Sequence, residues 1–300
     1  MGSFIATWHP LFDLICIHCI LAYSQYVALR AGLFSLATAG FASVGGYAGA
    51  YLLKNAHWDP LISGLAAILC GVAAGLFLSL PLARLRGAFQ AIATIGFVQI
   101  MVSLTLYAAP ITGGALGLNG IPKVATTIPL IIILALILVF LTTINRSGIG
   151  RAFDAVRQDY TVAASLGISI NTYFRYAFAL SGGLGALGGC LVAFNTYSIQ
   201  PEVFGFPLLV SAIAAVILGG RASVAGPAVG TTFLLVLPEV ARPLADERLL
   251  VQGVLLIIVI IYLPQGIVDS LLQRYRSATT TRSSTAAQPP QEGPYGLPSA

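Results

Sequence analysis

The feature that most constrains this chain is a series of long apolar runs without a charged residue. A helix needs roughly 17 to 25 apolar residues to cross a bilayer. Ala222 to Pro238 is short and holds Pro227 and Gly230, so a broken or re-entrant helix is an alternative there. The sequence predicts an all-α, polytopic transmembrane bundle of about nine spans, with a range of about eight to ten. The predicted spans are Leu14 to Leu29, Ala31 to Leu53, Pro60 to Ala83, Gly87 to Ala109, Thr126 to Ile144, Tyr176 to Tyr197, Val203 to Gly220, Ala222 to Pro238 and Leu249 to Val268.

The basic residues predict the orientation, because loops rich in lysine and arginine stay in the cytoplasm. With about nine alternating spans, 11 of the 15 Lys and Arg fall on the side of residues 150–168 and four on the other. The net charge of +5 therefore reflects the orientation of the chain in the membrane and does not indicate nucleic-acid binding. The cytoplasmic set is Arg30, Arg84, Arg86, Arg146, Arg151, Arg157, Arg175, Arg221, Arg274, Arg276 and Arg282, against Lys54, Lys123, Arg242 and Arg248 outside.

Two regions are predicted on this basis. Residues 1–276 form a transmembrane permease domain, and residues 277–300, rich in Ser, Thr, Pro and Ala, form a disordered cytoplasmic tail. The N-terminus has no basic residue before its apolar run, so we expect no cleaved signal peptide.

Motifs for chemistry are weak in this chain. No GxxxxGK[ST] sequence occurs, so we expect no ATP hydrolysis and no cofactor of its own. The glycines at 183, 185 and 188 match GxGxxG but lie in an apolar helical run without a preceding strand. Cys16 and Cys19 form one CxxC without a second pair, which favours buried thiols over a metal site. We therefore predict neither a catalytic nor a metal site.

Glycine pairs four residues apart recur in the spans and predict close helix packing. Because few ionisable groups lie within the spans, a pump driven by protons or sodium through intramembrane carboxylates is disfavoured. Any transport would take its energy from elsewhere. The pairs are Gly45 with Gly49, Gly71 with Gly75, Gly185 with Gly189, and Gly226 with Gly230.

One stretch, GRAFDAVRQDYTVAASLGI at residues 150–168, concentrates charge in an otherwise apolar chain. Phe153, Val156 and Tyr160 recur at helical spacing, which predicts one amphipathic cytoplasmic helix. Asp154 is three residues from both Arg151 and Arg157, so neighbouring charges on this helix have opposite signs. Such a helix fits a groove on a partner protein. The alternative is a helix that lies on the membrane surface.

The same stretch and its continuation resemble the M-type permease subunits of branched-chain amino acid ABC importers. The matching elements are Gly150-Arg151-Ala152, Ala155-Val156-Arg157 and Ala163-Ala164 followed by Gly167. Further blocks resemble the family in order over about residues 12–272. They are GLFSLATAGFASVGGYAGAYL, LRGAFQAIATIGF, ITGGALGLNGIP and AVILGGRASVAGPAVGTTFLLVLPE.

The resemblance implies a permease in a bacterial inner membrane with its C-terminus in the cytoplasm. Its implied partners are a second homologous permease chain, two cytoplasmic ATP-binding subunits that use ATP, an extracytoplasmic solute-binding protein and the lipid bilayer, without nucleic acid. The implied docking residues for the ATP-binding subunits are Arg151, Arg157, Ala163, Ala164 and Gly167. The implied solute-pathway residues are Gly113, Gly114 and Asn119.

The chain departs from the family pattern in two blocks. Ser35, Leu36, Ala37 and Thr38 stand where Ser-Leu-Gly-His is common, and Ala115 and Leu116 replace a polar pair. Branched-chain amino acids remain the expected solute, with other hydrophobic amino acids, amides or urea-like solutes as alternatives. A stand-alone secondary transporter is a further alternative, which uptake by the chain alone would identify.

Overall fold

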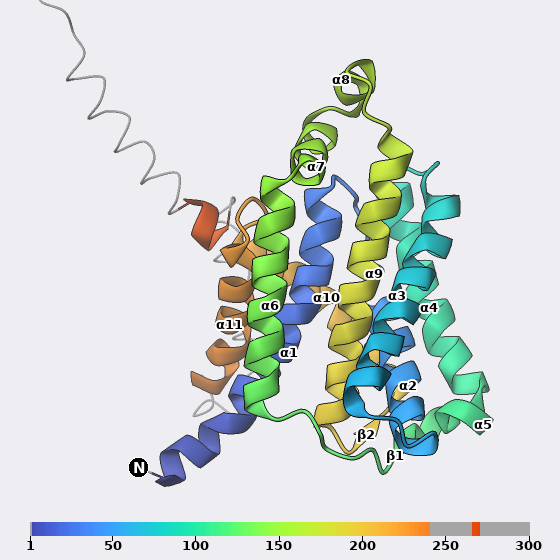
Figure 1. Ribbon diagram of the computed structural model, residues 1–300, viewed down its shortest axis with the longest axis vertical. Helices are drawn as coiled ribbons and strands as arrows, with labels where there is room; N and C mark the ends of the chain where they lie inside the picture. Colours follow the sequence, from blue (N-terminus) through green and yellow to red (C-terminus); the bar gives the residue numbers. More distant parts are fainter. Residues whose placement is uncertain (1, 241–265, 271–300) are drawn as a thin grey trace, which may run out of the picture.

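The computed structural model of the chain describes residues 2–240 and 266–270, and this part is almost entirely helical (Figure 1). The all-α prediction is confirmed, with one two-residue strand pair in addition. The elements are α1 (Gly2–Arg30), α2 (Thr38–Asn55), α3 (Pro60–Leu82), α4 (Ala88–Tyr107), α5 (Ala109–Thr112), η1 (Gly114–Leu116), β1 (Leu118–Asn119), α6 (Thr127–Arg146), α7 (Gly148–Gln158), α8 (Tyr160–Ser165), α9 (Ile170–Asn195), β2 (Ser198–Ile199), η2 (Pro201–Phe204), α10 (Phe206–Gly219) and α11 (Ala225–Val240).

The predicted spans correspond to helices of the bundle. Eight of the nine lie on α1, α2, α3, α4, α6, α9, α10 and α11, and the ninth, Leu249 to Val268, lies mostly outside the described residues. Within the described part, six helices are long and apolar enough to cross a membrane, while the apolar part of α11, Ala225–Leu237, is shorter. The tail from residue 277 also lies outside the described residues.

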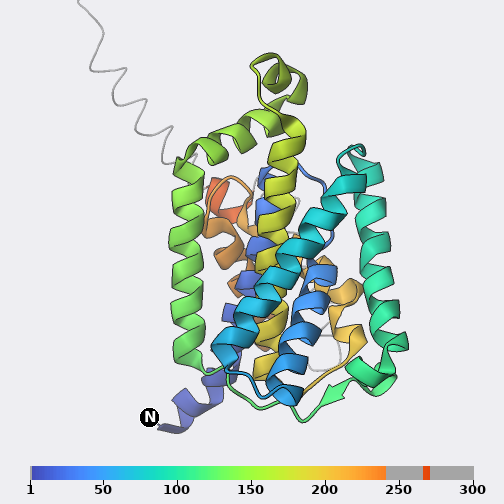
Figure 2. The same cartoon turned by 45° about the vertical axis from the view of Figure 1, so that its right-hand side comes forward.

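Helix α9 forms the centre of the bundle, with α1, α2 and α3 packed around it (Figures 1 and 2). Its small residues allow this contact. A methyl group on Gly189 would overlap the backbone of Ala42 in α2, and one on Gly182 would overlap the backbone of Gly71 in α3. The glycine pairs predicted for packing therefore lie where helix backbones meet.

Helix α2 begins later than predicted. The expected span starts at Ala31, but residues 33–36 lie outside any helix or strand and the helix begins at Thr38. Gly32, with φ of +78°, ends α1 in the left-handed conformation that glycine permits. Backbone N–H groups of this segment donate to buried side chains in place of helical carbonyls. Gln90 Oε1 accepts the Phe34 N–H at 3.1 Å, and Thr94 Oγ1 accepts the Leu36 N–H at 2.9 Å.

The two ends of the bundle differ in structure (Figure 1). One end carries α7 and α8, and the other carries α5, η1 and the antiparallel β1–β2 pair. Arg30, Arg146 and Arg221 follow helices that end on the side of α7, whereas Lys54 ends α2 on the opposite side. The helix directions thus agree with the predicted segregation of basic residues.

Candidate docking site and solute-pathway residues

The charged stretch at residues 150–168 forms two helices, so the prediction of a single helix is wrong. Helix α7 ends at Gln158, and α8 begins at Tyr160. The intervening Asp159 is extended, and its Oδ1 accepts the N–H groups of Thr161 at 2.7 Å and Val162 at 3.2 Å. An aspartate that caps a new helix in this way competes with continuation of the previous one.

Helix α7 turns its apolar side into the protein. Phe153 is 2% exposed and Val156 is buried with it, in a cluster that includes Phe174 of α9. The Phe153 ring lies edge-on to Tyr173, with 6.2 Å between centroids. This half of the predicted stripe therefore packs against the chain itself and is not available to a partner.

Helix α7 is also fixed to the end of α1 by polar contacts. The guanidinium of Arg30 donates to Asp154 Oδ2 at 3.0 Å, to the Tyr26 hydroxyl at 2.7 Å and to the Ala222 carbonyl at 3.2 Å. Its side chain is 12% exposed, so water screens the ion pair less than at an open surface. At Gly32, an added methyl group would lie 3.1 Å from the Arg157 Cα. Arg30 thus joins α1, α7 and the loop before α11.

Helix α8 turns its apolar side chains outward. Tyr160, Val162 and Leu166, called the docking tip below, are 53%, 54% and 72% exposed. Arg86 lies over the ring of Tyr160, with its guanidinium carbon 5.3 Å from the ring centroid. Helix α8 stands beyond the ends of the long helices (Figures 1 and 2). The apolar tip is therefore presented outside the bundle.

The five predicted docking residues divide between the two helices. Arg151, Ala164 and Gly167 are exposed, Arg157 is half-buried beside Asp154, and Ala163 is 1% exposed within the protein. Gly167 has φ of +81° and ends α8, with open space around its Cα. Ala163 supports α8 from inside, whereas the other four are reachable from outside.

The sequence pattern did not point to Val162 and Leu166, because it treats residues 150–168 as one helix that continues through Asp159. The signal was present in the sequence, since Asp159 followed by Tyr160 and Thr161 is typical of a helix start. Counting helical positions from Asp159 places Val162 and Leu166 four residues apart, on the same side of the helix.

The predicted pathway residues lie at the opposite end of the bundle. Gly113 and Gly114 have φ of +78° and +61°, and they form the turn between α5 and η1. Asn119 lies in β1 opposite Ser198 of β2, and its carbonyl accepts a hydrogen bond of 2.7 Å from Lys54 Nζ. The turn alone explains both glycines, so contact of the three residues with a solute stays a prediction.

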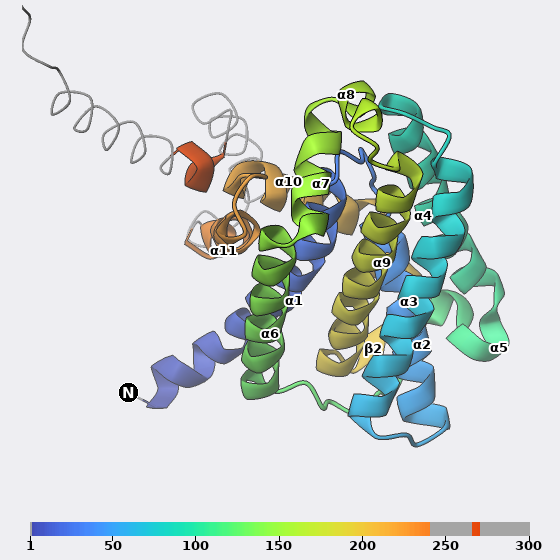
Figure 3. The same cartoon turned by 45° about the horizontal axis from the view of Figure 1, so that its top comes forward.

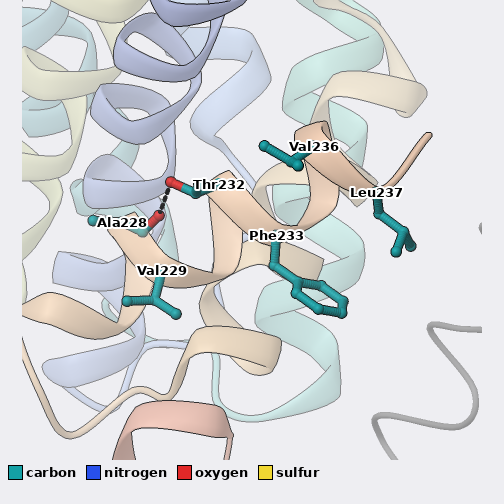
Figure 4. A pocket seen from close by; sticks show the side chains of 6 residues that line it. All are labelled: Ala228, Val229, Thr232, Phe233, Val236 and Leu237. Carbon is teal, nitrogen blue, oxygen red and sulfur yellow. Dashed lines mark hydrogen bonds between the residues drawn. The ribbon is translucent and has the colours of Figure 1, made fainter. Parts of the chain in front are cut away.

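Most pockets of the described part are apolar. A pocket of about 540 Å³ lies along one side of α11, and Figure 4 shows the six side chains that line it. Its one hydroxyl, on Thr232, donates to the Ala228 carbonyl of the same helix at 2.8 Å. This surface therefore offers a polar solute no free hydrogen-bonding side chain.

Among the described residues, no group of three or more His, Cys, Asp or Glu lies close enough to hold a metal ion.

Comparison with known proteins agrees with a membrane-spanning helical bundle. Residues 11–261 match the family model described as branched-chain amino acid transport system / permease component. The chain is 31% identical to the high-affinity branched-chain amino acid transport system permease protein LivM of Escherichia coli K12 over 275 residues, which cover 79% of this chain. It is 30% identical to LivM of Salmonella typhimurium over the same share. No solved structure matches the chain.

A more distant relative carries a different name. The autoinducer 2 import system permease protein LsrC of Enterobacter sp. strain 638 is 31% identical over 189 residues, which cover 54% of each chain.

The fold and these matches define a multi-pass membrane permease. The chain belongs to the family of permease components of branched-chain amino acid transport systems. It covers 64% of the length of either LivM protein.

Proposed function

We propose that this chain is the membrane-spanning permease subunit of an ATP-driven importer of branched-chain or other hydrophobic amino acids. It works with a second homologous permease chain, two cytoplasmic ATP-binding subunits and an extracytoplasmic solute-binding protein. It lies in a bacterial inner membrane, with α7, α8 and the C-terminus in the cytoplasm. Family membership and the LivM relatives support this proposal.

The observation that carries the proposal is the exposed docking tip at the arginine-rich end. Tyr160, Val162 and Leu166 expose apolar surface beyond the long helices. A helix that lies on an anionic membrane surface carries Lys or Arg on its polar face, but α8 and its cap contain only Asp159 as a charged residue. A groove on a protein partner suits this composition, because it can bury the apolar tip while α7 remains fixed to the bundle.

The contacts of α7 give a physical route for coupling. ATP-driven closure of the partner subunits moves α8, and α7 moves with it because only Asp159 separates the two helices. The Arg30–Asp154 ion pair and the close approach of Gly32 to Arg157 then act on the end of α1 and on residues 33–36. That non-helical segment can exchange its hydrogen bonds to side chains more readily than a helix can break. The bundle is thereby biased between inward-facing and outward-facing states.

The chain has no phosphate-binding loop of its own, so ATP is bound and hydrolysed by the partner subunits. The test is leucine uptake into proteoliposomes that contain both permease chains, with and without the ATP-binding subunits. We expect uptake only with the subunits, the binding protein and ATP present. Uptake of the same size by this chain alone would contradict the proposal and identify a stand-alone transporter.

The match to a permease of an autoinducer 2 import system leaves room for a solute other than an amino acid. The second candidate is an ATP-driven importer of urea, an amide or another small polar solute. Direct uptake assays with labelled leucine and labelled urea in the same proteoliposomes separate the candidates, since only leucine is imported in the first case and only the polar solute in the second.

A further inference from the structure

A pocket with three polar side chains lies between α1, α10 and α11. Its volume is about 440 Å³, within the range of about 300 to 1,000 Å³ of small-molecule sites. His18, Ser211 and Thr231 contribute its polar groups, and apolar residues that include Val210 and Leu234 form the rest.

The three polar residues lie well inside their helices. His18 is nine residues from the start and twelve from the end of the apolar segment His9–Arg30. Ser211 lies in the first half of α10 and Thr231 in the first half of α11. At a rise of about 1.5 Å per residue, His18 is roughly 18 Å along the helix from Arg30. The pocket is therefore near the middle of the bilayer, where a polar side chain is costly and usually serves a function.

Two contacts fix how α11 lies along α1. The Tyr23 hydroxyl donates to the Val224 carbonyl at 2.9 Å, and the Cys19 thiol approaches the Ala228 carbonyl at 3.9 Å. Cys19 precedes Tyr23 by four residues in α1, whereas its partner Ala228 follows Val224 by four residues. The two helices are therefore antiparallel. The same register brings Thr231 to within about one turn of His18.

The Thr231 hydroxyl is a free hydrogen-bonding group in this pocket. Thr231 is 2% exposed, and its Oγ1 has no hydrogen-bond partner among the described residues, although the Cys19 thiol lies close by. A buried hydroxyl without a partner is destabilising, so such groups are rare in native structures. A bound ligand or water that accepts or donates a hydrogen bond removes this cost.

The composition of the lining defines which solute fits. The imidazole of His18 and the hydroxyl of Thr231 can donate to a carboxylate or accept from an ammonium group. The Ser211 hydroxyl donates to the Leu208 carbonyl at 2.9 Å and can only accept from a solute. The apolar residues can cover a hydrocarbon side chain. Among the described residues, no Asp, Glu, Lys or Arg lines the pocket, so a solute with a net charge would find no counter-ion among them. A polyhydroxylated solute would leave most of its hydroxyls unpaired. A neutral zwitterion with an aliphatic side chain suits all of these features.

We propose that the pocket of His18, Ser211 and Thr231 is an intramembrane subsite for the zwitterionic aliphatic solute. This rests on the proposed function, since it names where the imported amino acid is held during transport. The Thr231 hydroxyl and the His18 ring bind its polar groups, and Val210 and Leu234 cover its side chain.

The test is Thr231→Val, which keeps the shape of the side chain and removes the hydroxyl. The matched control is Thr232→Val, because Thr232 is the next residue, is exposed, and already bonds within α11. In the reconstituted complex we expect the KM for leucine uptake to rise at least tenfold for Thr231→Val and less than twofold for Thr232→Val. The yield of complex should stay at the wild-type value and the melting temperature should not fall, since the lost hydroxyl has no hydrogen-bond partner among the described residues. A KM for Thr231→Val within twofold of wild type would overturn the subsite.

A second measurement follows binding without uptake. In a chain whose native cysteines are replaced by alanine, Ser211→Cys is labelled with a small thiol reagent. Leucine should slow the labelling at least fivefold, and lysine should leave it unchanged. Equal labelling rates with and without leucine contradict the subsite. A wild-type complex that shows no ATP-dependent uptake contradicts instead the proposed function, so the two failures are distinct.

Discussion

Helices α7 and α8 are neighbours in sequence but use their apolar residues in opposite ways. Helix α7 buries Phe153 and Val156 in the bundle and ties Asp154 to Arg30. Helix α8 exposes Val162 and Leu166 and is supported inside mainly by Ala163. Figure 3 shows both at the same end of the molecule, above α9. The difference indicates separate roles: α7 anchors both helices to the bundle, and α8 contacts the proposed partner subunit.

The largest effect is expected from the buried side of α7. Phe153→Ala leaves a cavity between α7 and α9, and such changes cost about 3–5 kcal/mol. The yield of folded protein and the melting temperature in detergent should both fall. Leu166→Ala in α8 is the control, since a substitution at an exposed position stays within about 0.5 kcal/mol. Equal melting temperatures for the two variants would show that α7 does not anchor the pair.

The next effect concerns docking. Leu166→Asp places a carboxylate on the docking tip, where burial against a partner leaves it unpaired. We expect uptake and co-purification of the ATP-binding subunits to drop at least tenfold while the melting temperature is unchanged. Leu116→Asp is the control for co-purification, because Leu116 is 79% exposed at the opposite end of the bundle. Normal co-purification with Leu166→Asp would remove α8 from the interface.

A smaller effect is expected at the joint between α7 and α1. Arg30→Ala breaks the contacts with Asp154, Tyr26 and Ala222 but leaves the docking tip intact. Uptake per complex should fall about three- to tenfold while the ATP-binding subunits still co-purify and hydrolyse ATP. The exposed Arg146, replaced by Ala, serves as the control. Loss of co-purification and uptake in equal proportion would assign Arg30 to docking and not to coupling.

The smallest effect is the pH dependence of α8. Hydrogen bonds from the Thr161 hydroxyl and from the N–H groups of Thr161 and Val162 lower the pKa of Asp159. A lowered pKa means that the cap stabilises α8 fully above the unfolded pKa of about 3.9 and is lost as pH falls through the folded value. Hydrogen exchange of residues 160–165, corrected for intrinsic rates, should therefore quicken at acidic pH. Asp159→Asn should abolish this dependence, and an unchanged dependence in that variant would contradict the cap.

The sequence predicted the bundle well because apolar length and glycine spacing are local signals. Segments such as Pro60 to Ala83 need no knowledge of their neighbours to be identified as spans. The start of α2 was not predictable in this way, since Gln90 and Thr94 of a distant helix hold the non-helical residues before it by hydrogen bonds. The break at Asp159 was predictable in principle, whereas the inward packing of Phe153 and the convergence of His18 with Thr231 depend on tertiary contacts.

The central claim is that α8 contacts an ATP-binding subunit, and photocrosslinking tests it most directly. A photoreactive amino acid is placed at position 166 in the docking tip or at position 116 at the other end, in complexes that retain ATP-dependent uptake. We predict a crosslink from position 166 to an ATP-binding subunit, and none from position 116. An active complex in which position 166 crosslinks only to lipid would contradict the claim.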